Sequence, residues 1–223
     1  WMKGYENREV FSAMSPPSEA FRRAMVPSEI SQAPLHTLVV RQSGEAWTKP
    51  FAAVFEPCSE SEPATINSIE AFSATGASDA FVGLRIESLS GRTDYVLSSD
   101  KALSCTYQDI SFTGTFGVVT REGNSTTLFL GSGTQLAEGS LRIEMAGNEA
   151  GSAVLSSADG IFFLTADSPV KIMIPDSFGK GVPVLDLGTK QIEGSRSEEG
   201  EINMIEFLVP VVSWQELDLL IEN

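Results

Sequence analysis

Residues 115–130, TFGVVTREGNSTTLFL, decide the fold class of this chain. Two short runs rich in β-branched and aromatic residues, Thr115–Thr120 and Thr126–Leu130, flank the tripeptide Glu122-Gly123-Asn124. Because Gly and Asn tolerate positive φ angles, this tripeptide is typical of a tight turn between two strands. The stretch therefore predicts a β-hairpin.

Short apolar runs separated by Gly, Asn, Asp and Ser continue on both sides of this hairpin. In Ser140–Met145 apolar and polar residues alternate, and Val170, Ile172 and Ile174 repeat the same two-residue spacing, which is the period of a strand with one buried face. Further strands are predicted at Leu35–Gln42, Phe51–Glu56, Ile66–Phe72, Phe81–Ser88, Thr93–Leu97, Ala153–Ser156 and Ile161–Thr165. This spacing indicates an all-β protein, and we predict a large antiparallel β-sandwich with little helix.

Residues 1–34 differ in composition from the rest of the chain. Prolines at positions 16, 17, 27 and 34 interrupt them, so we expect an irregular lead-in with a short helix around Ser18–Met25. Residues 35–223 are expected to form the β-sandwich domain. Within it, Lys190–Gly200 is polar and predicted to be an exposed loop, and only Trp214–Ile221 has apolar spacing that suits a helix. Since the chain opens at Trp1, we expect a fragment or a processed form of a longer protein.

Composition narrows the classes of partner. The chain has 223 residues, of which 42% are hydrophobic, enough for a substantial core. Fifteen basic residues against thirty acidic ones give a formal net charge of −15, which disfavours nucleic acid as a partner. No apolar run approaches about 18 residues, so membrane insertion is not expected.

The sequence offers no set of catalytic or metal-binding residues. Its one histidine and two cysteines exclude zinc sites built mainly from His and Cys. His36 lies inside an apolar run, where a buried structural histidine is the favoured interpretation over a catalytic one. Cys58 and Cys105 are interpreted as two buried thiols, with a disulfide as the alternative. We therefore assign no catalytic residue, no metal ligand and no cofactor.

Two local motifs contain residue types that bind ligands in other proteins. Glu56, Glu60 and Glu62 cluster beside prolines, but their spacing matches no calcium loop, so a solvated acidic loop is favoured. Gly131-Ser132-Gly133 is interpreted as a turn between strands. No helix is expected after it, and the motif therefore does not indicate a phosphate-binding loop.

Aromatic and basic residues near predicted turns suggest contact with sugars. Trp47 follows the turn at Gly44, close to Arg41, and Arg92 and Tyr95 surround another predicted hairpin. An exposed Trp can stack on a sugar ring, and Arg can form a fork with a carboxylate or sulfate. Arg41, Trp47, Arg92 and Tyr95 are therefore the candidate substrate-binding residues. The alternatives are that Trp47 packs onto the sheet and that Arg41 pairs with a cross-strand acid.

Several stretches resemble a known family. They are Leu38–Trp47 (LVVRQSGEAW), Pro50–Pro57 (PFAAVFEP), Phe11–Pro17 (FSAMSPP) and Gly91–Tyr95 (GRTDY). Together they resemble the C-terminal β-sandwich portion of heparinase II/III-like polysaccharide lyases and related bacterial proteins. In that family a helical toroid precedes the sandwich, and the active site lies between the two. There a Tyr or His abstracts the proton next to the carboxylate of the uronic acid.

This sequence departs from the family because it has no toroid, and Tyr5, Tyr95 and Tyr107 match no catalytic motif. The resemblance implies an accessory β-sandwich domain of a polysaccharide lyase, inactive alone, that packs on an absent helical domain. It also implies a periplasmic or secreted protein with an acidic polysaccharide as partner. The alternatives are an independent carbohydrate-binding module and a purely structural domain of a secreted protein.

Overall fold

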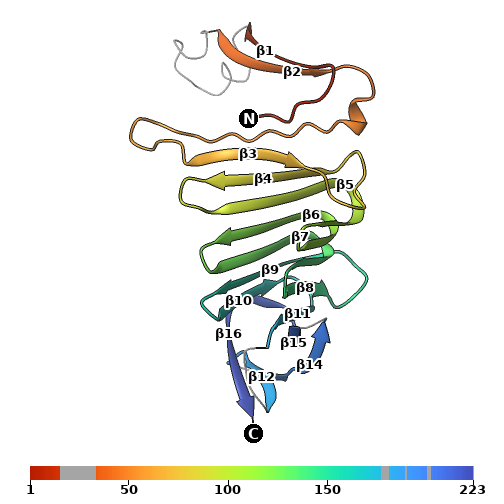
Figure 1. Cartoon of the computed structure of the whole chain (residues 1–223), viewed down its shortest axis with the longest axis vertical. Helices are drawn as coiled ribbons and strands as arrows, with labels where there is room; N and C mark the ends of the chain where they lie inside the picture. The colour runs from red at the N-terminus through yellow and green to blue at the C-terminus, as the bar shows by residue number, and fades with distance from the viewer. Residues whose placement is uncertain (16–33, 177–180, 189, 200–201, 223) are drawn as a thin grey trace, which may run out of the picture. The chain divides into compact units, whose positions relative to one another are not determined.

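The computed structural model describes residues 1–15, 34–176, 181–188, 190–199 and 202–222 (Figure 1). They form two compact units: Met2–Ala53, the N-terminal unit, and Trp1 with Val54–Asn223, the sheet unit. Apart from the 3-10 turn η1 (Ala46–Thr48), every regular element in these ranges is a β-strand. The predicted all-β fold with little helix is confirmed. No helix in these ranges has the length and hydrophobicity needed to cross a membrane.

The N-terminal unit contains a two-stranded antiparallel sheet. Strands β1 (Arg8–Ser15) and β2 (Leu35–Gln42) pair along their full length. The expectation of an irregular lead-in is wrong for β1, because the proline-rich part begins only after this strand and β2 supplies its partner. The short helix expected around Ser18–Met25 lies outside the described residues. The strand predicted at Phe51–Glu56 is reduced to a single bridge between Met2 and Ala53.

The sheet unit contains the other strands, joined in a 14-stranded sheet. They are β3 (Ile66–Phe72), β4 (Val82–Ser88), β5 (Thr93–Tyr107), β6 (Ile110–Glu122), β7 (Ser125–Glu138), β8 (Leu141–Met145), β9 (Gly151–Ala158), β10 (Ile161–Ala166), β11 (Val170–Pro175), β12 (Val182–Asp186), β13 (Gln191–Glu193), β14 (Ser195–Glu199), β15 (Ile202–Val209) and β16 (Val212–Glu222). Figure 1 shows β3 to β7 as successive hairpins.

The long strands β5, β6 and β7 take part in two layers. Layer A contains β3, β4, the first half of β5, the second half of β6, the first half of β7, and then β9, β10, β16, β12 and β13. Layer B contains the remaining halves of β5, β6 and β7, and then β8, β11, β15 and β14. Buried residues of both layers form one hydrophobic core. Strands that change layer at bulges are a known way to build the corner of a sandwich.

Register shifts allow one strand to face the core in both layers. On β6, Ile110, Phe112 and Gly114 are buried before the shift, and Gly117 and Val119 are buried after it. The buried positions thus change from even to odd numbers. Since side chains alternate with a period of two, one extra residue is needed to keep the apolar side inward after the bend.

Glycines permit the close approach of β6 and β7 at this corner. Gly114 lies opposite Gly133, and a Cβ added to Gly114 would come within 2.4 Å of the Ser132 carbonyl oxygen. The interpretation of Gly131-Ser132-Gly133 as a turn is wrong, since these residues lie inside β7. Gly133 allows the close approach of two strands at the corner and does not form a loop.

The C-terminal region also differs from expectation. The segment predicted as a helix, Trp214–Ile221, belongs to β16, which pairs with both β10 and β12. Pairing on both sides satisfies the backbone of β16 and overrides its helix-like apolar spacing. Lys190–Gly200, predicted as a loop, contains the polar strands β13 and β14.

Candidate functional site

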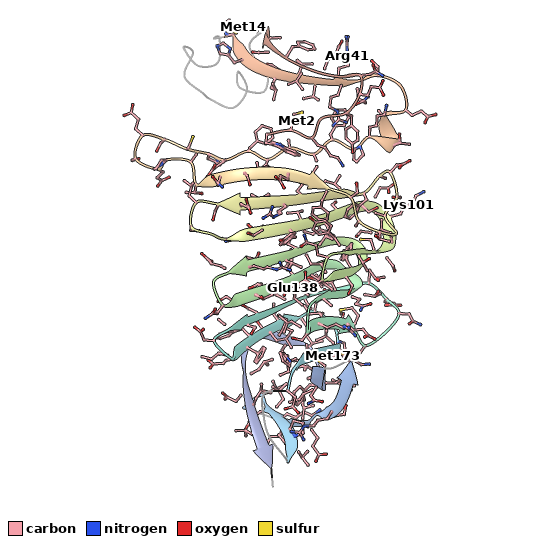
Figure 2. All side chains as sticks on the ribbon, viewed as in Figure 1. Met2, Met14, Arg41, Lys101, Glu138 and Met173 are labelled. Atoms are coloured by element: carbon pink, nitrogen blue, oxygen red, sulfur yellow. The ribbon has the colours of Figure 1, made fainter. Side chains whose placement is uncertain are left out.

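The predicted sugar-binding residues come from both units of the chain. Arg41 and Trp47 belong to the N-terminal unit, whereas Arg92 and Tyr95 belong to the sheet unit. Arg41, labelled in Figure 2, lies opposite Glu9 across the β1–β2 pair, and its Nε donates to Glu9 Oε2 at 2.8 Å. The cross-strand ion pair weighed from the sequence is therefore present. Trp47 lies in η1, and its side chain is outside what the structure describes.

The guanidinium of Arg92 is held by a neighbouring acid. Its Nε lies 3.1 Å from both oxygens of Asp94, and its Nη2 lies 3.0 Å from Asp94 Oδ1. Thr120 Oγ1 also donates to Asp94 Oδ1, at 2.5 Å. Arg92 is thus exposed but already forked onto a carboxylate, which a glycan carboxylate would have to displace.

Tyr95 is only 4% exposed, so the expectation that it borders an exposed surface is wrong. Alternation along β5 turns Asp94 outward and Tyr95 inward. Its ring packs against Phe72 and Tyr107, with centroid distances of 6.3 and 6.1 Å. Tyr95 is therefore part of the core.

Arg121 joins the two layers beside Tyr95. Its Nη2 donates to Asp109 Oδ1 at 2.7 Å and pairs with Glu138 Oε1 at 2.6 Å, while its guanidinium lies 5.0 Å from the Tyr95 ring centroid. Burial opposes the charged form of Arg121, but the hydrogen bond to Asp109 and the charge of Glu138 outweigh it and raise the pKa of Arg121. Glu138, labelled in Figure 2, ends β7 in layer B, whereas Arg121 lies in layer A. This network of Arg121, Asp109, Glu138 and Tyr95 links layer A to layer B, and we call it the staple.

The other residues singled out from the sequence are also placed. His36 is exposed on β2, so its interpretation as a buried histidine is wrong. Cys105 is buried as expected, but Cys58 is exposed, and both are free thiols. Burial raises the pKa of the Cys105 thiol. The alternative of a disulfide is excluded in this structure.

Glu60 and Glu62 are exposed, as predicted for a solvated acidic loop, and Glu56 closes this loop through hydrogen bonds. Its Oε1 accepts hydrogen bonds from Thr65 N at 2.5 Å, Thr65 Oγ1 at 2.8 Å and Ile66 N at 3.1 Å. The backbone hydrogen bond from Thr65 is the main cause that lowers the pKa of Glu56. Within the described ranges, no group of three or more His, Cys, Asp or Glu side chains has an arrangement that could hold a metal ion.

Three adjoining depressions lie on the outer side of layer B, where β5, β6, β7 and β8 run side by side. Their volumes are about 340, 400 and 400 Å³. The first two share Thr113 and Gln135, and the last two share Met145, Ala146 and Gly147, so each depression adjoins the next and we treat the three together as one groove. We call it the hydroxyl groove. Its polar lining residues are Thr75, Ser104, Thr106, Ser111, Thr113, Thr134, Gln135, Glu144, Asn148, Glu149 and Ser168.

Strand alternation places these polar groups in the groove. Ser111 and Thr113 alternate with buried Ile110 and Phe112 on β6. Across the strand pair, Ser104 Oγ and Thr113 Oγ1 lie 3.0 Å apart. The alternation of hydroxyl-bearing and apolar residues is visible in the sequence, but only the pairing of four strands shows that the hydroxyl groups lie together. The groove is therefore not among the sites predicted from the sequence.

A second group of functional interest surrounds Arg8 in the N-terminal unit. The guanidinium carbon of Arg8 lies 4.5 Å from the Tyr5 ring centroid and 4.4 Å from that of Phe51. Its Nη1 donates to the carbonyl of Lys3 at 2.8 Å, and its Nη2 to that of Lys49 at 2.6 Å. Its Nε donates to Gln42 Oε1 at 3.1 Å. Arg8 thus connects three segments of this unit, and we call Lys3, Tyr5, Arg8, Lys49 and Phe51 the cation–aromatic cluster.

Two comparisons with known proteins point to the same kind of relative. Residues 66–155 match a family described as the endo-acting ulvan lyase C-terminal domain. The likeness is to a polysaccharide lyase C-terminal domain. The chain is also 32% identical over 139 residues to the endo-acting ulvan lyase of Formosa agariphila, covering 58% of this chain and 16% of that protein. The chain thus spans about a sixth of the length of this relative.

These comparisons support a polysaccharide lyase as the class of related protein, as the sequence analysis expected, but they do not confirm the heparinase II/III-like type. No solved structure matches the chain. The lyase C-terminal domain match runs from β3 into β9, so the staple and the strands that carry the hydroxyl groove lie inside it. The cation–aromatic cluster lies outside it.

Proposed function

We propose that this chain is a non-catalytic accessory domain of a polysaccharide lyase and that it binds the polysaccharide along the hydroxyl groove. The observation that carries the proposal is the groove itself, which is rich in hydroxyl groups and lies, apart from Ser168 and Pro169, within the region similar to a lyase C-terminal domain. The ulvan lyase relative makes ulvan the first ligand to test. Export to the periplasm or the medium belongs to the same proposal, because a polysaccharide is met outside the cytoplasm.

The chemistry of the groove suits a sugar chain. Sugars are bound through many hydroxyl groups that both donate and accept, and Ser, Thr, Gln and Asn side chains offer both functions. Neighbouring strands are about 4.8 Å apart, so a channel across four strands is about 15 Å long and accommodates a short oligosaccharide. Its lining contains no Lys or Arg and no exposed aromatic side chain. The groove therefore favours weak binding through hydrogen bonds.

The positions of the tyrosines and the histidine support a non-catalytic role. β-Elimination needs a base held next to a group that neutralises the uronate. Tyr95 is buried and Tyr107 stacks on Phe72 with a centroid distance of 3.9 Å. Tyr5 lies under the cations of its cluster, and His36 is exposed on a strand of the N-terminal unit.

The chain alone is expected to show no lyase activity. It is incubated with ulvan, heparin, alginate and chondroitin, and the absorbance of the unsaturated product is followed. The expected result is no turnover above a heat-inactivated control. Robust turnover that disappears in His36→Ala would contradict the proposal and make His36 catalytic.

Binding is tested with a matched pair of variants. Thr113→Val removes a groove hydroxyl and is expected to weaken ulvan binding about three- to tenfold, which is the change in affinity that the loss of one hydrogen bond causes. Thr127→Val is the control, because Thr127 Oγ1 pairs with Ser156 Oγ at 2.9 Å in layer A, as Thr113 pairs with Ser104 in layer B. Isothermal titration calorimetry measures both.

Two results of this titration would contradict binding in the groove. If both variants lose the same amount of ulvan affinity, the loss comes from a change in the fold and not from a lost contact in the groove. If the wild-type chain does not bind ulvan, a purely structural domain is favoured. The packing of this domain on a helical partner domain stays a prediction.

A further inference from the structure

Charge is distributed unevenly between the two units. Residues 2–53 contain six Lys and Arg against five Asp and Glu, whereas residues 54–223 contain nine against twenty-five. The acidic excess of the chain thus belongs to the sheet unit. An anionic ligand is repelled far less by the N-terminal unit, where the cation–aromatic cluster lies.

The cluster is held in shape by Arg8, whose donors are taken up by backbone carbonyls and by Gln42. Lys3 keeps its charge available. Its Nζ lies 4.9 Å from the Tyr5 ring centroid, and neither Lys3 nor Lys49 forms an ion pair with any residue that the structure describes. Phe51 lies against Arg8 yet is 55% exposed.

The cluster therefore combines an unpaired ammonium group with an exposed aromatic ring. A sugar ring has an apolar side that packs on an aromatic ring, and an acidic sugar also carries an anionic group for the ammonium. A simple anion would use only the cation, and a neutral sugar only the ring. The nearby acids Glu6 and Glu45 are exposed, so solvent and salt screen them.

We propose that the cation–aromatic cluster is a second glycan-binding site, one that takes acidic sugar residues. It rests on the proposed function, because its ligand is a stretch of the same kind of polysaccharide. It extends that function, because the hydroxyl groove has no cation and does not select for acid. Lys3 binds the anionic group, Phe51 packs on the sugar ring, and Arg8 positions both.

The test uses the full chain and three probes: polygalacturonate, which is acidic, heparin, which is sulfated, and neutral dextran. Lys3→Gln is expected to weaken binding of polygalacturonate about fivefold and to reduce the salt dependence of binding, with no effect on dextran. Phe51→Ala is expected to weaken the same binding to a similar extent. Lys3→Arg, which keeps the charge, is expected to retain binding within twofold.

The outcomes separate this site from the groove. If Lys3→Gln and Phe51→Ala bind polygalacturonate as the wild type does while Thr113→Val weakens binding, the cluster inference is wrong and the proposed function stands. If the cluster variants lose binding and Thr113→Val does not, the cluster is supported and the groove is not. If the wild type binds neutral dextran as tightly as it binds polygalacturonate and heparin, the cluster does not select acidic sugars and the inference is overturned.

Thermal unfolding controls for the fold of these variants. The backbone N–H of Lys3, which donates to the Ala52 carbonyl at 2.9 Å, is retained in both substitutions at this position. A loss of binding with unchanged unfolding therefore reports on the side chain. A loss of binding that accompanies a lowered transition in Lys3→Gln but not in Lys3→Arg would count against a ligand contact.

Discussion

At the scale of single residues, the two arginines of the N-terminal sheet show how similar positions acquire different roles. Arg8 and Arg41 both lie on the β1–β2 pair. Arg41 makes an exposed ion pair with Glu9, which contributes little to stability because water and salt screen it. Arg8 instead uses its fork to hold several carbonyls, a geometry that the single ammonium of Lys cannot reproduce.

Arg8→Lys is therefore expected to destabilise the N-terminal unit by about 1–3 kcal/mol, the range for hydrogen bonds to a charged group. Hydrogen exchange measured by mass spectrometry is expected to show lost protection in β1 and β2, with the sheet unit unchanged. Arg41→Lys is the matched control, expected within about 0.5 kcal/mol of the wild type. Equal protection in Arg8→Lys and wild type would show that the cluster is not held by Arg8.

At the same scale, the expectation that Tyr95 is exposed is wrong for a clear reason. The hairpin predicted around Arg92 and Tyr95 is present, and Gly91 in its turn has a φ of 87°. Residues beside a turn are not all exposed, however, because the strand that follows alternates between core and solvent. Arg92 lies in the turn and is exposed, whereas Tyr95 lies in β5 and is buried.

At the scale of elements, the corner between β6 and β7 decides the architecture. Both strands shift register there, and Gly114 and Gly133 bring the two backbones close together. Without a corner, the halves of these strands would continue in one flat sheet, and their apolar faces would have no opposite layer to pack against.

Gly114→Ala is expected to destabilise the sheet unit by about 3 kcal/mol, since backbone atoms would have to move. For a unit of this size, the thermal transition is expected to fall by about 6–12 °C. Gly147→Ala is the control, because a Cβ there would meet nothing closer than Glu149 N at 4.0 Å. Differential scanning calorimetry makes the comparison. An unchanged transition in Gly114→Ala would mean that the corner is less tightly packed than the structure indicates.

At the scale of the whole molecule, local signals in the sequence determined the all-β class and many strand positions. Ile66–Phe72 and Leu35–Gln42 match the observed strands residue for residue. The turn at Asp159-Gly160 has φ angles of 50° and 84°, as its residue types predict. These features depend on a few neighbouring residues, so their physical causes are readable from the sequence.

Only the tertiary structure decided how the strands are combined. The double layering of β5 to β7, the use of Gly131-Ser132-Gly133 inside a strand and the strand state of Trp214–Ile221 depend on partners far away in the chain. The hydroxyl groove also depends on them, since its polar residues come from four paired strands. Periodicity shows that a residue lies on one side of a strand. Which side faces the core, and which side chains from other strands lie beside it, is set by long-range register and packing.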